Sequence, residues 1–224
     1  MKRIAFYGGS FDPLHNGHLT IARELLKVFA LDEFVFVPAF HAPHKLGKTV
    51  SSAFHRFAML ALATNDAPKI EVSKMELELP ERPFTVETLT RLLNEMPDTE
   101  IFFVMGADSW ADITTWREWE KVLTLVNIIV VTRPNYEIGF AHITDEIRAR
   151  IVDLREDFPA KAQRRKEKKS KIQNPKSEIF ITDSVQIDVS ATEIRRKIKE
   201  NATDWRADVS NEVAKYIEKY ELYK

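Results

Sequence analysis

The chain has 224 residues, of which 44% are hydrophobic and 30% charged, and these values fit one large or two small globular domains with a sizeable core. It has no cysteine, which excludes a disulfide framework and a zinc site built on thiolates, and makes a reducing cytoplasm the simplest setting. No apolar run approaches the roughly 20 residues of a membrane span, and the N-terminal run is not a signal peptide, so we expect a soluble cytoplasmic protein without membrane contact.

Charge is distributed unevenly along the chain. The formal net charge is -1, but the segment Lys161 to Lys176 carries +7, from eight basic residues against one glutamate, which leaves about -8 for the rest. A mostly acidic body argues against a broad nucleic-acid footprint, so any positive field for an anionic substrate must be local. We expect this basic tract to form an exposed, partly disordered loop, and its charge leaves a contact with RNA or an acidic protein open.

The first half of the chain alternates predicted strands and helices. Lys2 to Tyr7 is a short apolar run closed by Gly8 and Gly9, and apolar residues then recur with helical spacing from Leu19 to Phe29. The alternation continues with a strand at Phe34 to Val37, a helix at Ser52 to Asn65, a strand at Ile70 to Ser73, a helix from about Thr85 to Met96 and a strand at Ile101 to Met105.

The second half continues the same pattern. It contains a Trp-rich helix from about Ser109 to Leu125, strands at Ile128 to Thr132 and Glu178 to Thr182, and helices at Ser190 to Glu200 and about Asp208 to Tyr223. Apolar strands separated by helices predict right-handed βαβ crossovers and an α/β fold, a Rossmann-like, doubly wound parallel sheet with C-terminal helices. In such sheets ligands bind at the carboxyl ends of the strands, where this chain has Gly8 to His18, Pro38 to Lys45, Gly106 to Asp108 and Arg133.

The segment Gly8 to His18, with the sequence GGSFDPLHNGH, is the first candidate site. The two glycines let the chain turn sharply and let a ligand approach the backbone, while the following helix directs free N–H groups and its positive dipole end at that space. His15 and His18 stand three apart at the start of this helix, so both imidazoles can donate hydrogen bonds to phosphate oxygens. A Gly-Gly pair alone is more often an ordinary turn, but the whole string predicts phosphate handling and nucleotidyl transfer.

The string closely resembles the signature of the HxGH nucleotidyltransferases, with His15-Asn16-Gly17-His18 as the HxGH element, and the rest of the chain is similar to the bacterial nicotinate-nucleotide adenylyltransferase family. Four further segments resemble family motifs in the same order: Pro43-His44-Lys45, Phe84 to Thr88, Gly106-Ala107-Asp108 with Trp116, and Val189 to Arg195. The resemblance covers nearly the whole chain, so we expect one nucleotidyltransferase domain over residues 1–224 with a basic insertion at about 155–177.

The resemblance implies adenylyl transfer from ATP to nicotinate mononucleotide, giving deamido-NAD and pyrophosphate in NAD biosynthesis. His15, His18 and Arg195 would be catalytic, because they would hold the triphosphate and stabilise its developing charge. Mg²⁺ would be delivered with ATP, since no carboxylate cluster has metal-ligand spacing. We therefore predict no metal-ligating residue in the chain. The ATP site would comprise Gly8, Gly9, Ser10, Phe11, His15, His18, Gly106, Asp108, Arg133, Ser190, Thr192 and Arg195. The nicotinate mononucleotide site would comprise His44, Lys45, Thr85 and Trp116.

The segment Ser190 to Glu193 has the pattern of a capping box, in which Ser190 would accept from the N–H of Glu193 while the Glu193 side chain reaches back. Arg195 lies three residues after Thr192 on the same helix face, so a hydroxyl and a guanidinium can flank an anion there. The neighbouring Arg196 and Lys197 are expected in solvent.

Aromatic residues near the other motifs can belong either to the hydrophobic core or to a ligand site. Tryptophans at helical spacing are more often core residues than ligand platforms, and only its spacing from Asp108 singles out Trp116, whose ring would by the resemblance stack on the pyridine ring. Phe84 and Glu87 replace the Tyr and Asp of the family's segment, so only Thr85 is carried over. His55 is expected at the surface or in ordinary packing.

Two other functions stay open. The nearest is an adenylyltransferase acting on nicotinamide mononucleotide or phosphopantetheine; Thr85 and Trp116 favour a pyridine nucleotide, but backbone N–H groups can recognise a carboxylate, so the sequence does not separate acid from amide. The second is a non-catalytic nucleotide-binding module, against which the intact His15, His18 and Arg195 argue. The oligomeric state is open, a homo-oligomer included, as are the contacts of Arg133.

Overall fold

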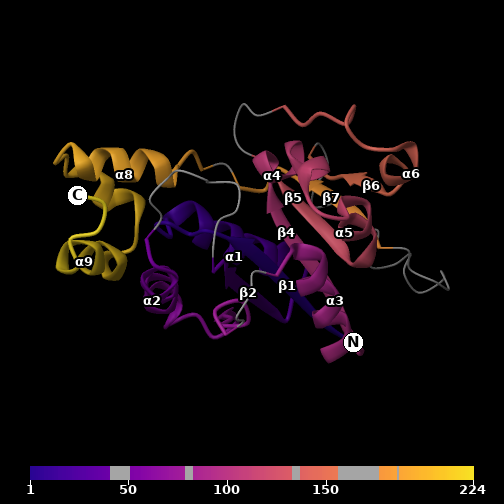
Figure 1. Cartoon of the computed structure of the whole chain (residues 1–224), viewed down its shortest axis with the longest axis horizontal. Coiled ribbons are helices and arrows are strands. Elements are labelled where there is room, and N and C mark those ends of the chain that lie inside the picture. The colour runs from indigo at the N-terminus through magenta and orange to yellow at the C-terminus, as the bar shows by residue number, and fades with distance from the viewer. Residues whose placement is uncertain (41–50, 79–82, 133–136, 156–176, 186) are drawn as a thin grey trace.

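The computed structural model describes residues 1–40, 51–78, 83–132, 137–155, 177–185 and 187–224. These residues form a seven-stranded sheet with the order β3-β2-β1-β4-β5-β7-β6, in which neighbouring strands pair in parallel (Figure 1). The strands are β1 Lys2–Gly9, β2 Glu33–Pro38, β3 Ile70–Val72, β4 Thr99–Gly106, β5 Asn127–Val131, β6 Ile151–Asp153 and β7 Ile179–Thr182. The predicted open, doubly wound α/β sheet is confirmed.

The connections between strands carry the helices. They are α1 Asn16–Val28, α2 Ala53–Thr64, α3 Thr85–Glu95, α4 Ala107–Ala111, α5 Trp119–Leu125, α6 Asp145–Arg148, α8 Ala191–Lys199 and α9 Asn211–Lys219. Between these helices, the described residues also form two short 3₁₀ turns, Ile113–Thr115 and Asp204–Asp208.

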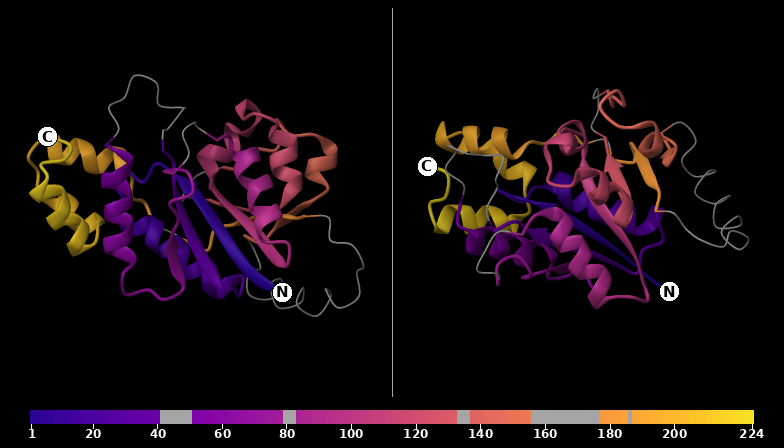
Figure 2. Two further views of the ribbon diagram at one scale, coloured as in Figure 1. Left: turned by 60° about the horizontal axis from the view of Figure 1, so that its bottom comes forward. Right: turned by 45° about the vertical axis from the view of Figure 1, so that its right-hand side comes forward.

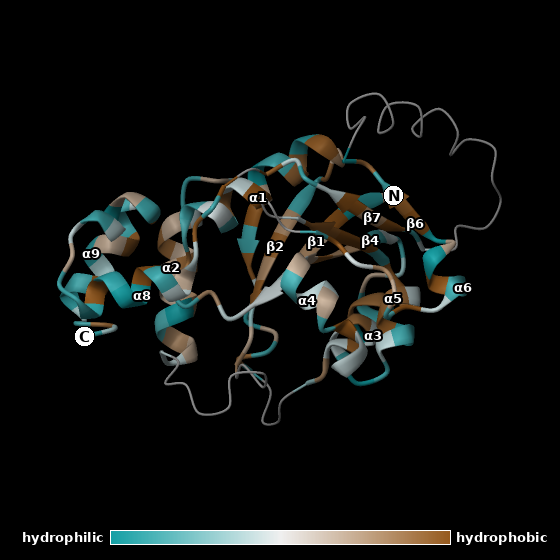
Figure 3. Cartoon of the chain, turned by 90° about the horizontal axis from the view of Figure 1, so that it is seen from above, coloured by the Kyte–Doolittle hydropathy of each residue, from teal (hydrophilic) through white to brown (hydrophobic). Residues whose placement is uncertain are grey.

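Different helices cover the two faces of the sheet, because successive strand residues point to opposite faces. Phe6 belongs to the apolar cluster that includes Leu89 of α3 and Trp110 of α4, whereas Tyr7 belongs to the cluster that includes Leu25 of α1. Hydrophobic residues accordingly gather in the strands at the centre, while α8 and α9 present both hydrophobic and hydrophilic faces (Figure 3). Burial on both faces accounts for the nearly uniform hydrophobicity of the strand sequences.

The strand order reverses direction beside β1. From β1 the chain moves outward through β2 and β3, then returns to place β4 on the other side, where Tyr7 pairs with Val104. In a sheet of this kind the ligand crevice opens at the carboxyl ends of the strands, next to that reversal. Gly9 of β1 and Gly106 of β4 end their strands at this edge.

The C-terminal helices α8 and α9 pack beside α2, away from the middle of the sheet (Figure 2). The apolar cluster between them includes Met59 of α2, Ile194 of α8, Trp205 of the second 3₁₀ turn and Val213 of α9. This packing brings the last helices to the carboxyl edge, near the start of α1.

Lys197, expected in solvent, instead fastens α8 to the second 3₁₀ turn. Its Nζ lies 2.9 Å from a carboxylate oxygen of Asp204 and 3.3 Å from one of Asp208. Arg196 is exposed, as expected, and pairs with Glu193 and Glu200 on its own helix.

The predicted Trp-rich helix from Ser109 to Leu125 is wrong. The segment divides into α4, the first 3₁₀ turn and α5, because Trp116 has an extended backbone (φ -80°, ψ 145°) and Glu118 a left-handed one (φ 50°). In one continuous helix, residues six apart point about 120° away from each other. The break lets Trp110 and Trp116 both pack against the same core cluster.

Smaller differences lie at the edge of the sheet and near its C-terminal end. The short elements α6 and β6 were not predicted, because three or four residues are too few to show a periodicity. The final helix starts at Asn211 instead of Asp208, since Ser210 caps it by accepting the N–H of Val213 at 3.3 Å. No helix in the described ranges is long and apolar enough to cross a bilayer.

Replacing Leu25 of α1 by alanine should destabilise the fold by about 2–5 kcal/mol, because the side chain is fully buried in the cluster between α1 and the sheet. Chemical denaturation measures this loss. Leu62→Ala is the matched control, since Leu62 is 42% exposed and should cost less than about 1 kcal/mol. Equal losses in the two variants would contradict the packing described here.

Candidate active site

The glycine turn after β1 is shaped by the phenylalanine that follows it. Phe11 has a left-handed backbone (φ 47°), and its ring returns over Gly9, where a Cβ atom would lie 2.8 Å from the ring. The buried ring meets Tyr7 and Phe36 edge-on, with centroids 5.4 and 5.2 Å apart. Gly9 is therefore required for close packing of the loop, which leads directly into α1.

His15 and His18 lie together at the start of α1, as predicted. Their rings are stacked, with centroids 3.7 Å apart and planes inclined by 27°. The backbone N–H of His15 donates to Nδ1 of His18 at 3.3 Å, so a neutral His18 ring carries its proton on Nε2. That N–H is a donor suited to a phosphate oxygen, and it lies at the N-terminal end of α1, where the helix dipole also favours an anion.

Gly17, the central residue of the HxGH element, lies against the His15 ring. A Cβ atom at Gly17 would be 3.0 Å from Nδ1 of His15 and 3.9 Å from Ile187. A larger residue would have to displace the imidazole, so glycine here preserves the placement of His15.

Helix α8 meets the loop after β1 through Arg195. Its Nη1 donates to the backbone carbonyl of Asp12, and its Nη2 donates to Oγ1 of Thr192 at 3.3 Å. A second tie joins the start of α1 to the C-terminal region, where Nδ2 of Asn16 donates to the carbonyl of Ala207 at 2.9 Å. The structure thus brings two motifs separated by more than 170 residues to one place.

The capping box predicted at Ser190 does not form. Ser190 is the N-cap of α8, but its side chain makes no capping hydrogen bond. The Glu193 carboxylate instead accepts from Arg196, one turn further along the helix. A charge-assisted bond to a guanidinium competes successfully with the neutral backbone N–H that the box would have used.

Gly106 and Asp108 continue the site from β4. A Cβ atom on Gly106 would lie 2.6 Å from Oδ1 of Asp108, so the glycine leaves room for that carboxylate to fold back. The same oxygen accepts the N–H of Ser109 at 3.0 Å. Asp108 is exposed at the edge of the sheet beside β1.

Trp116 is half-buried, and its ring packs edge-on against Phe103 with centroids 6.4 Å apart. Phe103 in turn lies 3.5 Å from the Cβ position of Gly8. One aromatic ring therefore separates Trp116 from the glycine turn. Trp110 is 1% exposed and belongs to the core, as expected of most tryptophans.

Arg117, the residue after Trp116, contacts the start of α3. The Arg117 guanidinium lies 4.7 Å from the centroid of the Phe84 ring and 3.5 Å from a carboxylate oxygen of Glu87. Glu87 also accepts the N–H of Phe84 at 2.9 Å, so this departure from the family's segment serves as a helix cap. Arg117 thereby ties the first turn of α3, which begins at Thr85, to the segment that follows Trp116.

Three residues to which the sequence analysis assigned no role form a buried polar group below the loop. Asp12 is 2% exposed, and its Oδ1 accepts from the hydroxyl of Tyr223 at 2.7 Å. Burial and the Asp12 carboxylate raise the pKa of Tyr223, so its hydroxyl stays a donor. The third residue is Arg56 of α2, which is only 1% exposed. A recognisable signal was its spacing from Met59 and Leu60, which places it on the apolar face of its helix.

Glu76 faces the same group from the segment after β3. Burial raises the pKa of its carboxyl to about 7, against the opposing effects of the Phe40 backbone and Arg56. This carboxyl therefore titrates close to neutral pH inside the fold.

The remaining predicted residues fall outside the described part of the chain. These are His44 and Lys45, Arg133, and the basic tract from Lys161 to Lys176. Of the other histidines, His55 bonds through Nδ1 to the hydroxyl of Tyr216 at 3.0 Å, which is the ordinary packing role expected of it.

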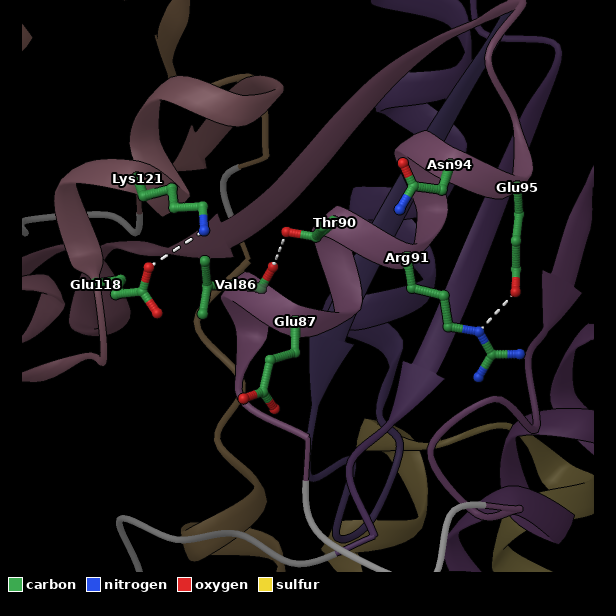
Figure 4. A pocket seen from close by; sticks show the side chains of 8 residues that line it. All are labelled: Val86, Glu87, Thr90, Arg91, Asn94, Glu95, Glu118 and Lys121. Atoms are coloured by element: carbon green, nitrogen blue, oxygen red, sulfur yellow. Dashed lines mark hydrogen bonds and ion pairs between the residues drawn. The ribbon is translucent and has the colours of Figure 1, made fainter.

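A hollow of about 460 Å³ lies on α3 and the start of α5, and it shares only the first turn of α3 with the predicted site. Its lining side chains are largely engaged with one another, through Arg91 with Glu95 and Lys121 with Glu118 (Figure 4). Within the described ranges, no group of three or more His, Asp or Glu side chains is arranged to hold a metal ion.

Comparison with known proteins gives consistent results. Residues 6–197 match the family model described as cytidylyltransferase-like. A probable nicotinate-nucleotide adenylyltransferase of Corynebacterium glutamicum is 34% identical over 222 residues, 99% of this chain and 88% of that protein. A Thermus thermophilus protein of the same description is also 34% identical, over 99% of this chain and all of its own. Among solved structures, Plasmodium falciparum nicotinic acid mononucleotide adenylyltransferase complexed with NaAD superposes with a TM-score of 0.73 at 21% identity, covering 100% of this chain and 98% of that one. This last likeness supports the fold.

The raised pKa of Glu76 predicts a dependence of stability on pH. The unfolded carboxyl ionises near 4.5 and the folded one near 7, so between these values the folded protein retains a proton that the unfolded chain loses. Stability should therefore fall as pH rises through this window. We expect the free energy of unfolding of the wild type, relative to Glu76→Gln, to be about 2 kcal/mol larger at pH 5 than at pH 7.5.

Urea denaturation at the two pH values measures this difference. Glu78→Gln is the control, because Glu78 is an exposed carboxylate two residues away. If Glu76→Gln and Glu78→Gln responded to pH in the same way, burial of Glu76 would not govern its ionisation.

Proposed function

Because the chain belongs to the cytidylyltransferase-like family, and within it to the nicotinate-nucleotide adenylyltransferases, we propose that it transfers the adenylyl group of ATP to nicotinate mononucleotide. The products are deamido-NAD and pyrophosphate. The observation that carries the proposal is the convergence of the stacked His15 and His18 rings with Arg195 at the carboxyl edge of the sheet. The two motifs that would bind the triphosphate from opposite sides are thereby joined.

The reaction is an in-line displacement at phosphorus. A phosphate oxygen of nicotinate mononucleotide attacks the α-phosphorus of ATP, a new P–O bond forms, and the bond to the bridging oxygen breaks as pyrophosphate leaves. The protein's part is to position the reactants and stabilise charge, as is usual for phosphoryl chemistry. In this proposal His18 donates from Nε2, His15 donates beside it, and Arg195 supports the leaving pyrophosphate.

The ATP site in this proposal extends along the carboxyl edge. It includes the backbone of Gly8 to Phe11, Gly106 and Asp108 from the end of β4, and Ser190 and Thr192 from the start of α8. The start of α8 lies against the loop after β1, which supports a shared role for these segments.

The acceptor site is proposed at Thr85 and Trp116. The half-buried Trp116 ring is held against Phe103, and a fixed aromatic face suits stacking on a pyridine ring. The link from Arg117 to Phe84 and Glu87 ties the first turn of α3, which begins at Thr85, to the residue after Trp116, and this supports a shared acceptor site. The proposed contact of His44 and Lys45 with a substrate phosphate rests on the resemblance and on their place in the sequence after the strand that ends near Pro38.

Mg²⁺ enters this reaction as part of the ATP complex. The carboxylates near the loop already accept hydrogen bonds, Asp12 from Tyr223 and Asp108 from Ser109. Magnesium commonly keeps several waters and binds through substrate phosphates, so a dedicated protein cage is not required.

We also propose that residues 1–224 act as one nucleotidyltransferase domain. The ties of α8 and Ala207 to the loop after β1 and to α1 support a single unit, because they make the C-terminal helices part of the site.

The test is to incubate the protein with Mg²⁺-ATP and, separately, nicotinate mononucleotide, nicotinamide mononucleotide and phosphopantetheine, and to follow pyrophosphate release. Release that is fastest with nicotinate mononucleotide is expected. Faster release with one of the other acceptors would replace the proposed substrate, and no release with any of them would exclude the enzymatic function.

Replacing His18 by alanine should lower kcat by about 10²–10³-fold, because one donor to the developing phosphate charge is lost. The thermal midpoint should change little, since the ring is only partly buried. His55→Ala is the matched control, because His55 contacts Tyr216 in the C-terminal packing. Normal turnover by the His18 variant would remove the HxGH pair from the mechanism.

A further inference from the structure

Arg56 has the least exposed surface of any charged residue in the described ranges, 1%. It lies on the inner face of α2, and no carboxylate oxygen of the described chain forms an ion pair with its guanidinium within 4.0 Å. Burial lowers its pKa, an effect opposed by the charges of Asp12 and Glu76. A buried guanidinium persists only where its N–H groups are well satisfied, so its partners reveal what it does.

The partners of Arg56 are backbone carbonyls from three segments. Nη1 donates to Ser10 at 2.7 Å, Nη2 donates to Ala39 at 2.6 Å and to Phe40 at 3.1 Å, and Nε donates to Ser51 at 3.1 Å. One side chain therefore connects the residue after the glycine pair, the residues after β2 and the residue before the N-cap of α2. A lysine has one nitrogen and cannot span acceptors that a planar guanidinium reaches in several directions.

Hydrogen bonds also join these segments directly to one another, and these bonds form only when the segments are correctly placed. The N–H of Ala39 donates to the carbonyl of Gly9 at 2.9 Å, and the N–H of Ser51 donates to Oδ2 of Asp12 at 3.3 Å. The carbonyl of Asp12 in turn accepts from Arg195. A shift of Ser10 relative to Ala39 would therefore move the loop that leads to His15 and also the acceptor of Arg195.

We propose that Arg56 is a positioning residue for the adenylyl transfer, which holds the loop after β1 and the segment after β2 in the register that aligns the phosphate-binding groups. The proposal rests on the proposed function. Arg56 acts through Ser10 and Asp12, without contact with the reacting atoms. Because rate depends on alignment more steeply than binding does, loss of this register should lower kcat more than it raises KM.

The test compares Arg56→Lys with Arg150→Lys. Arg150 is the control, because it is partly buried and its Nε likewise donates to a backbone carbonyl, that of Ser177 at 2.8 Å, but at the amino end of β7. Pyrophosphate release is measured for both variants at a temperature where circular dichroism shows them folded. We expect Arg56→Lys to lower kcat by about 10- to 100-fold with KM for ATP changed less than about threefold. Arg150→Lys should stay within about twofold of wild type in both constants.

A second readout is independent of activity. The Ala39 amide is protected by Gly9, so its hydrogen exchange reports the register of the two segments without substrate. Exchange at Ala39 should be at least about tenfold faster in Arg56→Lys than in the wild type and unchanged in Arg150→Lys. If the wild type released no pyrophosphate, the proposed function would fail, while faster exchange would still support the structural half of this inference.

Three results would overturn the proposal. The first is a folded Arg56→Lys protein with wild-type kcat, and the second is unchanged exchange at Ala39. The third is failure to fold by both Arg56→Lys and Arg56→Gln, the latter keeping two N–H donors, since Arg56 would then hold the whole fold together.

Discussion

The arrangement of this fold follows from the parallel pairing of β1 with β2 on one side and with β4 on the other. Because the strands are parallel, their carboxyl ends all lie at the same edge of the sheet, and the segments that follow them meet there although they are distant in sequence. The glycine turn after β1 and the Gly106 turn after β4 emerge beside each other for this reason. Both glycines are needed because side chains, Phe11 in one case and Asp108 in the other, fold back into the space a Cβ would fill.

The loops that converge at this edge carry backbone N–H and C=O groups, and these groups need hydrogen-bond partners wherever water is excluded. In this protein the buried Arg56 donates hydrogen bonds to four of these backbone carbonyls. Nearby, the hydroxyl of Tyr223 donates to the buried carboxylate of Asp12. Burying such charges contributes little net stability, and the arrangement is better understood as fixing geometry. The C-terminal helices take part through Arg195 and Tyr223, so packing between α2, α8 and α9 is coupled to the loop that holds His15 and His18.

Much of the fold could be predicted from the sequence, since burial on both faces makes parallel strands uniformly apolar and helices between them amphipathic. The errors occurred where tertiary contacts outweigh local pattern. The Trp-rich segment has helical spacing, but two tryptophans could reach the same core only by breaking the helix at Trp116. Ser190 and Glu193 have capping spacing, but Glu193 meets Arg196. Lys197 was expected in solvent because its acidic partners belong to a turn that sequence periodicity does not reveal.

For the proposed site, local spacing was enough to predict a phosphate-binding string, since it shows the glycines that allow close approach and the two histidines one turn apart. The sequence also determined, through the order of the motifs, the family to which the chain belongs. Three features became visible only in the folded chain: the two histidine rings stack, Arg195 reaches the loop after β1, and Arg56 and Glu76 lie beneath that loop. Hydrogen bonds such as those from Arg56 to Phe40 and from Arg195 to Asp12 join residues 16 and 183 positions apart, and contacts of this kind leave no periodicity in the chain. A buried arginine on an apolar helix face was the one local trace of them.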